Sequence, residues 1–234
     1  MTVADSTRRQ FGRVVLCVCA VLLAGCGPTV SGHPVTVPPT AVTRHVSAEL
    51  PALLPDPAQF PAPYVAVVLP QPAVSGAAAD LDGMGRGARV RPSRCAPAEQ
   101  GFQPDSVAMA VGSDEVTRAT LTVELLRTDE PLAALRARLT ECGSVRVSRA
   151  GAATTVTTEL DSPPRVAADD VLAFRRTVRS GSVGAGLTRS MWTRIGQIGD
   201  VRVSVTYMSF AEGEPDSAAL EALFVTAVRK VREE

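Results

Sequence analysis

The chain has 234 residues with 24 basic and 24 acidic side chains, and 45% of its residues are hydrophobic. This length allows one domain with a substantial core, and the balanced charge excludes the basic footprint of a nucleic-acid-binding protein. Only one of the basic residues, Lys230, is a lysine. Together with the many Ala, Val, Gly and Pro residues, this arginine bias indicates a GC-rich genome such as that of an actinobacterium.

The first 25 residues have the features of an export signal. Arg8, Arg9 and Arg13 precede an apolar run at 14–23, which is too short to cross a bilayer, since a spanning helix needs roughly 20 apolar residues. A basic stretch, a short apolar run and small residues together predict a secretory signal peptide. The segment TRRQFGR is also similar to the twin-arginine export signal. The sequence leaves open which export route is used.

The motif LAGC at 23–26 resembles the bacterial lipobox. This resemblance implies that residues 1–25 are removed and that Cys26 carries a diacylglyceryl or palmitoyl membrane anchor. The removed segment contains three Arg and one Asp, so the mature part has a net charge of about −2. The predicted location is the extracytoplasmic face of the cell membrane, in the cell envelope.

Residues 26–46 are rich in proline and have no periodic apolar pattern. Such a composition predicts an extended tether. Both histidines of the protein, His33 and His45, fall within it. We therefore expect a single folded domain at 47–234 that contains no histidine.

The elements expected at the start of this domain are a short helical turn within 47–57 and a strand at 63–70. The next stretch, 71–103, is rich in Gly, Pro and Ala and is expected to be irregular. Alternating apolar residues then predict two antiparallel strands, at 106–112 and 118–127. Leucines at helical spacing predict a helix ending near Cys142.

Alternation predicts five further strands and a final helix. The strands lie at 144–149, 154–160, 170–179, 187–198 and 200–210, and the helix begins near Pro215. Consecutive strands joined by short turns are antiparallel. The predicted fold class is therefore α+β, a mostly antiparallel sheet with two main helices packed on one face.

Of the five cysteines, Cys17 and Cys19 leave with the signal peptide and Cys26 takes the lipid. Cys95 and Cys142 remain. Two cysteines in an exported domain predict one disulfide, since the compartment is oxidising. The alternative, a free nucleophilic thiol, needs an activating neighbour that the sequence does not reveal.

No catalytic residue, metal site or cofactor is predicted. With both histidines in the tether, the domain lacks a Ser-His-Asp or Cys-His arrangement, and two cysteines do not make a zinc site. Motifs for a nucleophile elbow, a P-loop or a zinc protease are also missing. Adjacent acidic residues such as Asp169 and Asp170 are more typical of turns than of a hydrolase pair.

Arginines gather on two adjacent predicted strands. Arg175 and Arg179 share one face of the strand at 170–179, and Arg189 and Arg194 follow with Trp192 on the next strand. In a hairpin, their guanidinium groups could clamp a carboxylate or phosphate of a ligand. The alternative is a solvated arginine face and a tryptophan that belongs to the core.

The layout is similar to that of small mycobacterial-type lipoproteins of unknown function. The matching features are Leu53-Leu54-Pro55 at the start of the domain, Cys95, and the segment 139–143 that ends the central helix. Domains of this kind are similar to the extracellular sensor domains of mycobacterial serine/threonine kinases, although this chain lacks the second cysteine pair that the sensor family often carries.

The resemblance implies a non-enzymatic ligand-binding or sensor-like domain with an unknown envelope ligand or protein partner. A carrier of lipid or glycolipid is the alternative, and an envelope hydrolase ranks third. We expect the chain to be a monomer.

Overall fold

A computed structural model describes residue 42 and residues 44–85, 87–97, 104–149, 152–181, 186–211 and 213–234. Within these ranges, no helix is long and apolar enough to cross a bilayer. The predicted signal peptide and the lipobox cysteine Cys26 lie outside the described residues. So do both arginines of the export signal, Arg8 and Arg9.

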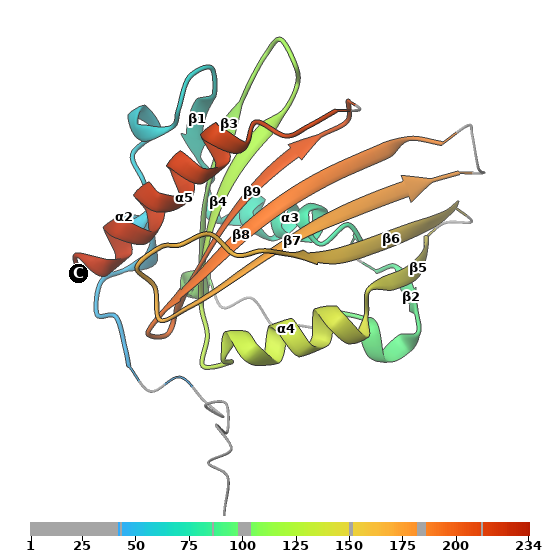
Figure 1. The fold of residues 1–234 in the computed structure, drawn as a ribbon, viewed down its shortest axis with the longest axis horizontal. Coiled ribbons are helices and arrows are strands. Elements are labelled where there is room, and N and C mark those ends of the chain that lie inside the picture. The colour runs from blue at the N-terminus through green and yellow to red at the C-terminus, as the bar shows by residue number, and fades with distance from the viewer. Residues whose placement is uncertain are drawn as a thin grey trace, which may run out of the picture. The chain divides into compact units, whose positions relative to one another are not determined.

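Nine antiparallel strands form one sheet in the order β1-β3-β4-β9-β8-β7-β6-β5-β2 (Figure 1). Their bounds are β1 Val65–Val68, β2 Arg89–Arg91, β3 Val107–Ser113, β4 Thr120–Arg127, β5 Ser144–Arg149, β6 Ala152–Asp161, β7 Asp170–Ser180, β8 Thr188–Ile198 and β9 Val201–Ser209. The predicted α+β class with a mostly antiparallel sheet is confirmed.

Four α-helices and three short 3-10 helices accompany the sheet in the described ranges. They are α2 Leu50–Leu53, α3 Gln71–Leu81, α4 Leu132–Glu141, α5 Ser217–Arg232, η1 Pro57–Gln59, η2 Ser93–Cys95 and η3 Pro104–Ser106. Helix α5 begins where the sequence predicts, because the carboxylate of Asp216 accepts a hydrogen bond of 3.0 Å from the backbone N–H of Ala219.

The main core lies between α5 and one face of the sheet. Alternate residues of β4 and β9, among them Val123 and Val203, are fully buried against Leu220 and Phe224 of α5. Helix α2 adds Leu50 and Leu53 to the same cluster. This face is therefore a continuous apolar layer.

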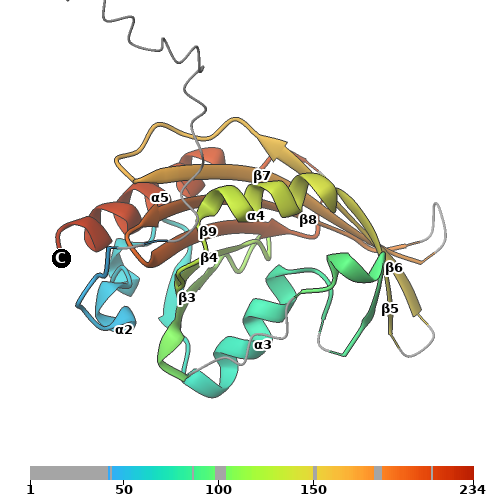
Figure 2. The same cartoon turned by 90° about the horizontal axis from the view of Figure 1, so that it is seen from below.

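The opposite face of the sheet carries α3 and α4. Leu139 of α4 packs in one cluster with Phe174 of β7 and Ile195 of β8, while Val74 of α3 packs against Met109 of β3. In Figure 2, the β3–β4 and β5–β6 parts of the sheet lie on either side of α3.

The two main helices, α4 and α5, thus lie on opposite faces of the sheet, whereas the sequence predicted that they share one. The reason is that the central strands bury side chains on both faces. A period-two pattern alone does not tell which buried face a helix covers.

The stretch 71–103 was also expected to be irregular, but it contains α3 and β2. Glycine and proline in QPAVSGAAADL lower its helix propensity. Pro72, however, lies in the first turn, where proline is tolerated, and Val74 and Ala78 are buried. Tertiary packing therefore supplies the stability that the local sequence lacks.

Residues just before the predicted domain start also pack on the sheet. The N–H of Val46 donates to Asp200 Oδ1 at 2.8 Å, and the ring Nδ1 of His45 lies 2.5 Å from Asp200 Oδ2. Gly199 has φ +54, and a Cβ there would lie 2.7 Å from the carbonyl oxygen of Arg44. The end of the predicted tether is thus seated against the β8–β9 turn.

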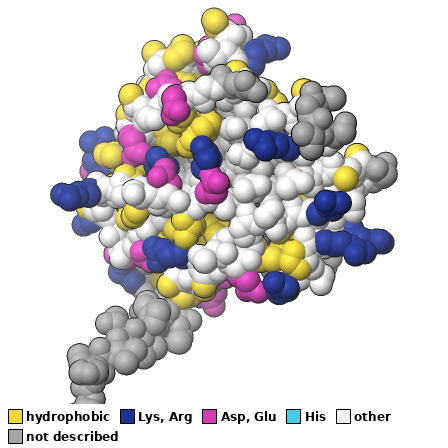
Figure 3. Space-filling view, turned by 45° about the vertical axis from the view of Figure 1, so that its right-hand side comes forward, with side chains coloured by type: hydrophobic (Ala, Val, Ile, Leu, Met, Phe, Trp, Pro, Cys, Tyr) yellow, Lys and Arg dark blue, Asp and Glu magenta, His cyan; other side chains and the backbone are white. Residues whose placement is uncertain are grey.

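We call strands β2, β5, β6 and β7 the wing. The face of the wing on the α5 side of the sheet is its outer face, and alternate side chains of these strands are exposed there. Figure 3 brings forward the side of the molecule that carries β5 and β6. Dark blue side chains gather on the right of this view, where magenta ones are sparse.

Candidate functional site

A cavity of about 1000 Å³ lies between the sheet and the two helices α3 and α4. Apolar side chains from both helices and from the sheet line it, among them Leu81, Leu126, Leu135, Leu139, Phe174 and Ile195. This volume is at the upper end of the range for pockets that bind small molecules.

The sheet contributes polar side chains to the floor of this cavity. They come from alternate positions of adjacent strands and so share one face: Thr158 of β6, Arg176 of β7, Thr193 of β8, Glu124 of β4, and Arg202, Ser204 and Thr206 of β9. The α5 face of β4 and β9, by contrast, is mainly apolar. The cavity therefore places charged groups of several adjacent strands between the sheet and a layer of helices.

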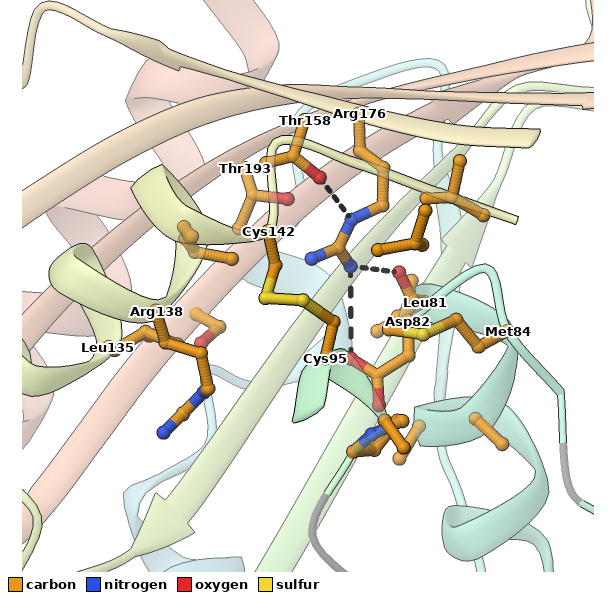
Figure 4. A pocket seen from close by; sticks show the side chains of 18 of the residues that line it. Leu81, Asp82, Met84, Cys95, Leu135, Arg138, Cys142, Thr158, Arg176 and Thr193 are labelled. Atoms are coloured by element: carbon orange, nitrogen blue, oxygen red, sulfur yellow. Dashed lines mark hydrogen bonds and ion pairs between the residues drawn. A yellow bond between two sulfur atoms is a disulfide. The ribbon is translucent and has the colours of Figure 1, made fainter. Parts of the chain in front are cut away.

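Arg176 connects the sheet to α3 (Figure 4). Its Nε donates to Thr158 Oγ1 at 3.2 Å and its Nη1 donates to the carbonyl oxygen of Leu81 at 3.0 Å, while Asp82 Oδ1 lies 3.8 Å away. The guanidinium also lies over the ring of Phe174, 5.1 Å from its centroid. Burial lowers the pKa of Arg176, and the charge of Asp82 opposes this. A cation at the C-terminal end of α3 stabilises the free carbonyls there.

Arg202 connects the sheet to the segment before α4. Its Nη2 donates to the backbone oxygen of Glu130 at 2.8 Å, its Nη1 donates to Glu130 Oε2 at 3.3 Å, and its Nε donates to Gln197 Oε1 at 3.2 Å. Burial lowers the pKa of Arg202, opposed by Glu130. The hydrogen bond from Arg138 holds the pKa of Glu130 below its usual value. Both buried arginines are thus compensated by hydrogen bonds, as buried charges must be.

Glu124 differs from these groups because its carboxyl has no such compensation. Within the described part of the chain, no group hydrogen-bonds to it. Desolvation by burial raises the pKa of Glu124 to about 7, the nearby charge of Asp82 adds to the rise, and Arg202 opposes it. At neutral pH this carboxyl can therefore donate or accept a hydrogen bond from a molecule in the cavity.

The disulfide between Cys95 and Cys142 lines the cavity and fixes η2 to the end of α4. It joins residues 47 positions apart, with a Cα–Cα distance of 5.7 Å. The predicted disulfide is confirmed. The bond thus joins two segments of the cavity wall that are far apart in the sequence.

The arginines predicted from the sequence are divided between the two faces of the sheet. Arg194 and Trp192 project on the α5 face, where Arg194 Nε donates to Glu221 Oε1 at 2.7 Å. The ring of Trp192 packs against the main core, and its centroid lies 5.8 Å from the ring centroid of Tyr207. These two residues thus have structural partners.

Arg175 is opposite Trp192 in the register of β7 and β8, and it pairs with Glu159 of β6. Arg179 is exposed further along the same face of β7. Arg189, in contrast, lies on the cavity side of the sheet, where its Nη2 donates to the carbonyl oxygen of Asp80 at the end of α3 at 3.0 Å. The structure brings Arg175 and Trp192 together but does not bring Arg189 to them.

Sequence reasoning missed Glu124, Arg176 and Arg202. All three occupy the polar positions of alternating strands, and such positions are usually solvent-facing in an antiparallel sheet. The sequence of β9 alternates apolar and polar residues, so it carries no local signal that Arg202 is buried. No group of three or more potential metal-ligating side chains occurs among the described residues.

The fold is similar to two solved structures. The extracellular domain of PknH from Mycobacterium tuberculosis matches with a TM-score of 0.42 and 11% identity, over 63% of this chain and 78% of that one. An uncharacterized protein from Mycobacterium smegmatis, the Rv0999 ortholog, matches with a TM-score of 0.42 and 17% identity, over 72% and 86%. No protein-family model matches, and the comparison with curated proteins finds no match. The resemblance to mycobacterial kinase extracellular domains is thus found in the structure as well.

Proposed function

We propose that this chain is an exported, lipid-anchored protein of the cell envelope whose domain binds a small molecule in the cavity between the sheet and helices α3 and α4. The observation that carries the proposal is the cavity of about 1000 Å³ with an unpaired carboxyl, Glu124, and two compensated buried arginines, Arg176 and Arg202, on its floor. Buried charged groups such as these contribute less to folding stability than an apolar layer like the one under α5. Their presence on the cavity floor therefore favours a role in binding.

The chemistry of the lining indicates what the ligand contains. Leucines from α3, α4 and β4 offer an apolar wall, and Glu124 offers a hydrogen-bonding group at the floor. Buried polar groups of this kind fix the orientation of a ligand, while the apolar wall supplies most of the affinity. The ligand is therefore amphipathic, with a hydrogen-bonding end that reaches the sheet.

Export is supported by the disulfide, because such bonds persist in oxidising compartments. The lipid anchor at Cys26 rests on the lipobox resemblance alone. A non-enzymatic role is supported by the three carboxyls that line the cavity. Neither Glu124 nor Asp82 is positioned by a side-chain hydrogen bond in the described part of the chain, and the carboxylate of Glu130 is already bound by Arg138 and Arg202. Catalytic acid–base pairs are usually held by such bonds.

A lipid or glycolipid carrier is the second candidate. The large cavity volume and the leucine-rich wall favour it. A carrier and a sensor differ in what occupies the cavity, because a carrier would be purified with lipid of high mass, whereas a sensor would hold a smaller molecule.

Native mass spectrometry of the purified protein tests the proposal, together with titration of the amphipathic dye 8-anilinonaphthalene-1-sulfonate. Leu135 lines the cavity, so L135W should fill part of it and abolish both the bound mass and one-to-one dye binding. Leu160 is 43% exposed and does not line the cavity, so L160W is the matched control and should keep both. Equal binding by the two variants would overturn the proposed site.

A further inference from the structure

The outer face of the wing carries an unusual row of arginines. In the register of the sheet, Arg91 of β2 lies directly opposite Arg146 of β5, Arg146 lies opposite Thr155 of β6, and Thr155 lies opposite Arg179 of β7. Neighbouring strands are about 4.8 Å apart, so the row spans about 14 Å. Arg89 follows on the same face, two residues from Arg91.

These arginines are exposed, and none of them has an ion pair or a side-chain hydrogen bond in the described part of the chain. Most other arginines there do have a partner, as Arg175 has in Glu159 on the same face. Two like charges directly opposite each other in an antiparallel pair are unfavourable. The Arg91–Arg146 pair therefore lacks the anion that would stabilise it.

Protection of a sheet edge does not account for the whole row. Charged residues on an edge strand prevent pairing with other chains, and β2 is such a strand. This explains Arg89 and Arg91. Arg146 and Arg179, however, lie on β5 and β7, which are paired on both sides. A second reason is needed for them.

The face is suited to phosphate groups. Each guanidinium can bind a phosphate through two N–H groups, and the exposed Thr155 adds a hydroxyl donor between Arg146 and Arg179. The nearest carboxylate of the face, Glu159, is already bound to Arg175. The positive charge comes from three strands, β2, β5 and β7, and is not gathered in a hollow. It therefore complements an array of phosphates better than a single anion.

We propose that the outer face of the wing docks on the anionic phospholipid headgroups of the membrane through Arg91, Arg146 and Arg179. The proposal depends on the proposed lipid anchor at Cys26 only because the anchor keeps the domain close to the membrane. The 17 residues from Cys26 to Val42 reach at most about 55 Å when extended, and the longest strands of the sheet, with 11 residues, span about 36 Å. The tether is therefore long enough for this face to reach the bilayer that holds the lipid.

Docking in this way would orient the ligand site. The arginines alternate along their strands with Val90, Val145 and Val147, which are buried on the cavity side. The row and the cavity thus lie on opposite faces of the sheet. With the row on the membrane, the cavity side faces away from the bilayer, which favours a ligand that arrives from the envelope rather than from the membrane.

The test measures binding of the full chain to vesicles by co-sedimentation. Vesicles of 30% phosphatidylglycerol in phosphatidylcholine are compared with pure phosphatidylcholine. The triple variant R91Q/R146Q/R179Q is compared with R118Q/R165Q/R229Q, which removes the same charge from exposed, unpaired arginines elsewhere on the described surface. All variants share the same N-terminal segment, so its contribution to binding cancels in the comparison.

We expect the partition coefficient onto anionic vesicles to fall about 100-fold in the first variant, because each arginine near an anionic surface contributes roughly fivefold, or ~1 kcal/mol. The control should change by less than about threefold, and the difference should disappear at high salt. Equal losses in the two variants would overturn the proposal.

A loss seen only toward soluble polyphosphate, with vesicle binding unchanged, would also overturn it and would point to an anionic wall polymer instead. Failure of docking leaves the cavity proposal intact, since ligand binding by the same variants is read independently by native mass spectrometry.

Discussion

Replacing Glu124 by Gln should stabilise the protein at alkaline pH and leave its stability nearly unchanged at acid pH. Desolvation in the cavity raises the pKa of Glu124 from 4.5 to about 7. The charge of Asp82 adds to this rise, and the charge of Arg202 opposes it. Between these two values the folded protein binds more protons at this site than the unfolded chain does. The free energy of unfolding therefore falls as the pH rises from about 4.5 to about 7, and it stays low above that.

The size of the effect follows from the pKa values. A pKa difference of 1 between the unfolded and folded states corresponds to about 1.4 kcal/mol. The rise of the Glu124 pKa from 4.5 to about 7 therefore means that its ionised form lowers the free energy of unfolding by at most about 3 kcal/mol at pH 8. Glu124 is only partly buried, and screening by solvent reduces this value. We expect E124Q to be more stable than the native protein by about 1–3 kcal/mol at pH 8 and by less than about 0.5 kcal/mol at pH 4.

Urea denaturation followed by circular dichroism at several pH values measures this difference. Every other titrating group is common to the two proteins, so the difference curve isolates Glu124. The control is E159Q: Glu159 is an exposed partner of Arg175, and its loss should cost less than about 1 kcal/mol with no gain at high pH. A difference between E124Q and the native protein that does not change with pH would refute the assignment of a desolvated carboxyl.

Three further outcomes are expected. Replacing both Cys95 and Cys142 by Ser should lower the free energy of unfolding by about 4 kcal/mol, because the bond closes a loop of 47 residues; unchanged urea midpoints would contradict this. Asp216→Ala should cost about 1 kcal/mol through loss of the helix cap on the Ala219 N–H, whereas Asp216→Asn keeps an acceptor and should cost less. Cys26→Ala should abolish incorporation of labelled palmitate, and a mutant that still carries label would disprove the lipobox prediction.

Much of the fold was predictable because its signals are local. The strand expected at 144–149 is β5, since apolar and polar residues alternate there without interruption. The final helix could be placed from its single apolar face and from Asp216 at its start. The disulfide followed from a cysteine count and an expected compartment rather than from geometry.

The cavity was not predictable, because its parts are defined by contacts between segments distant in sequence. Arg202 is seen as a buried residue only when β9 is placed between β4 and β8, with Glu130 above it. Helix α3, which forms one wall, contains Gly and Pro residues that made its segment look irregular in the sequence. The arginine hypothesis selected Arg175 and Arg179, which share a face, but the cavity opens on the other face of β7, where Arg176 lies.

The division of the apolar contacts into separate clusters has a consequence for motion. Helix α5 belongs to a single large cluster with the central strands, whereas α3 and α4 each rest on a small cluster of their own, with the cavity between them. Segments with few buried contacts open at lower free energy than the global unfolding transition. We therefore expect amide hydrogens of α3 and α4 to exchange with solvent faster than those of α5. The two helices can then move apart or together around an entering molecule while the sheet and α5 stay unchanged.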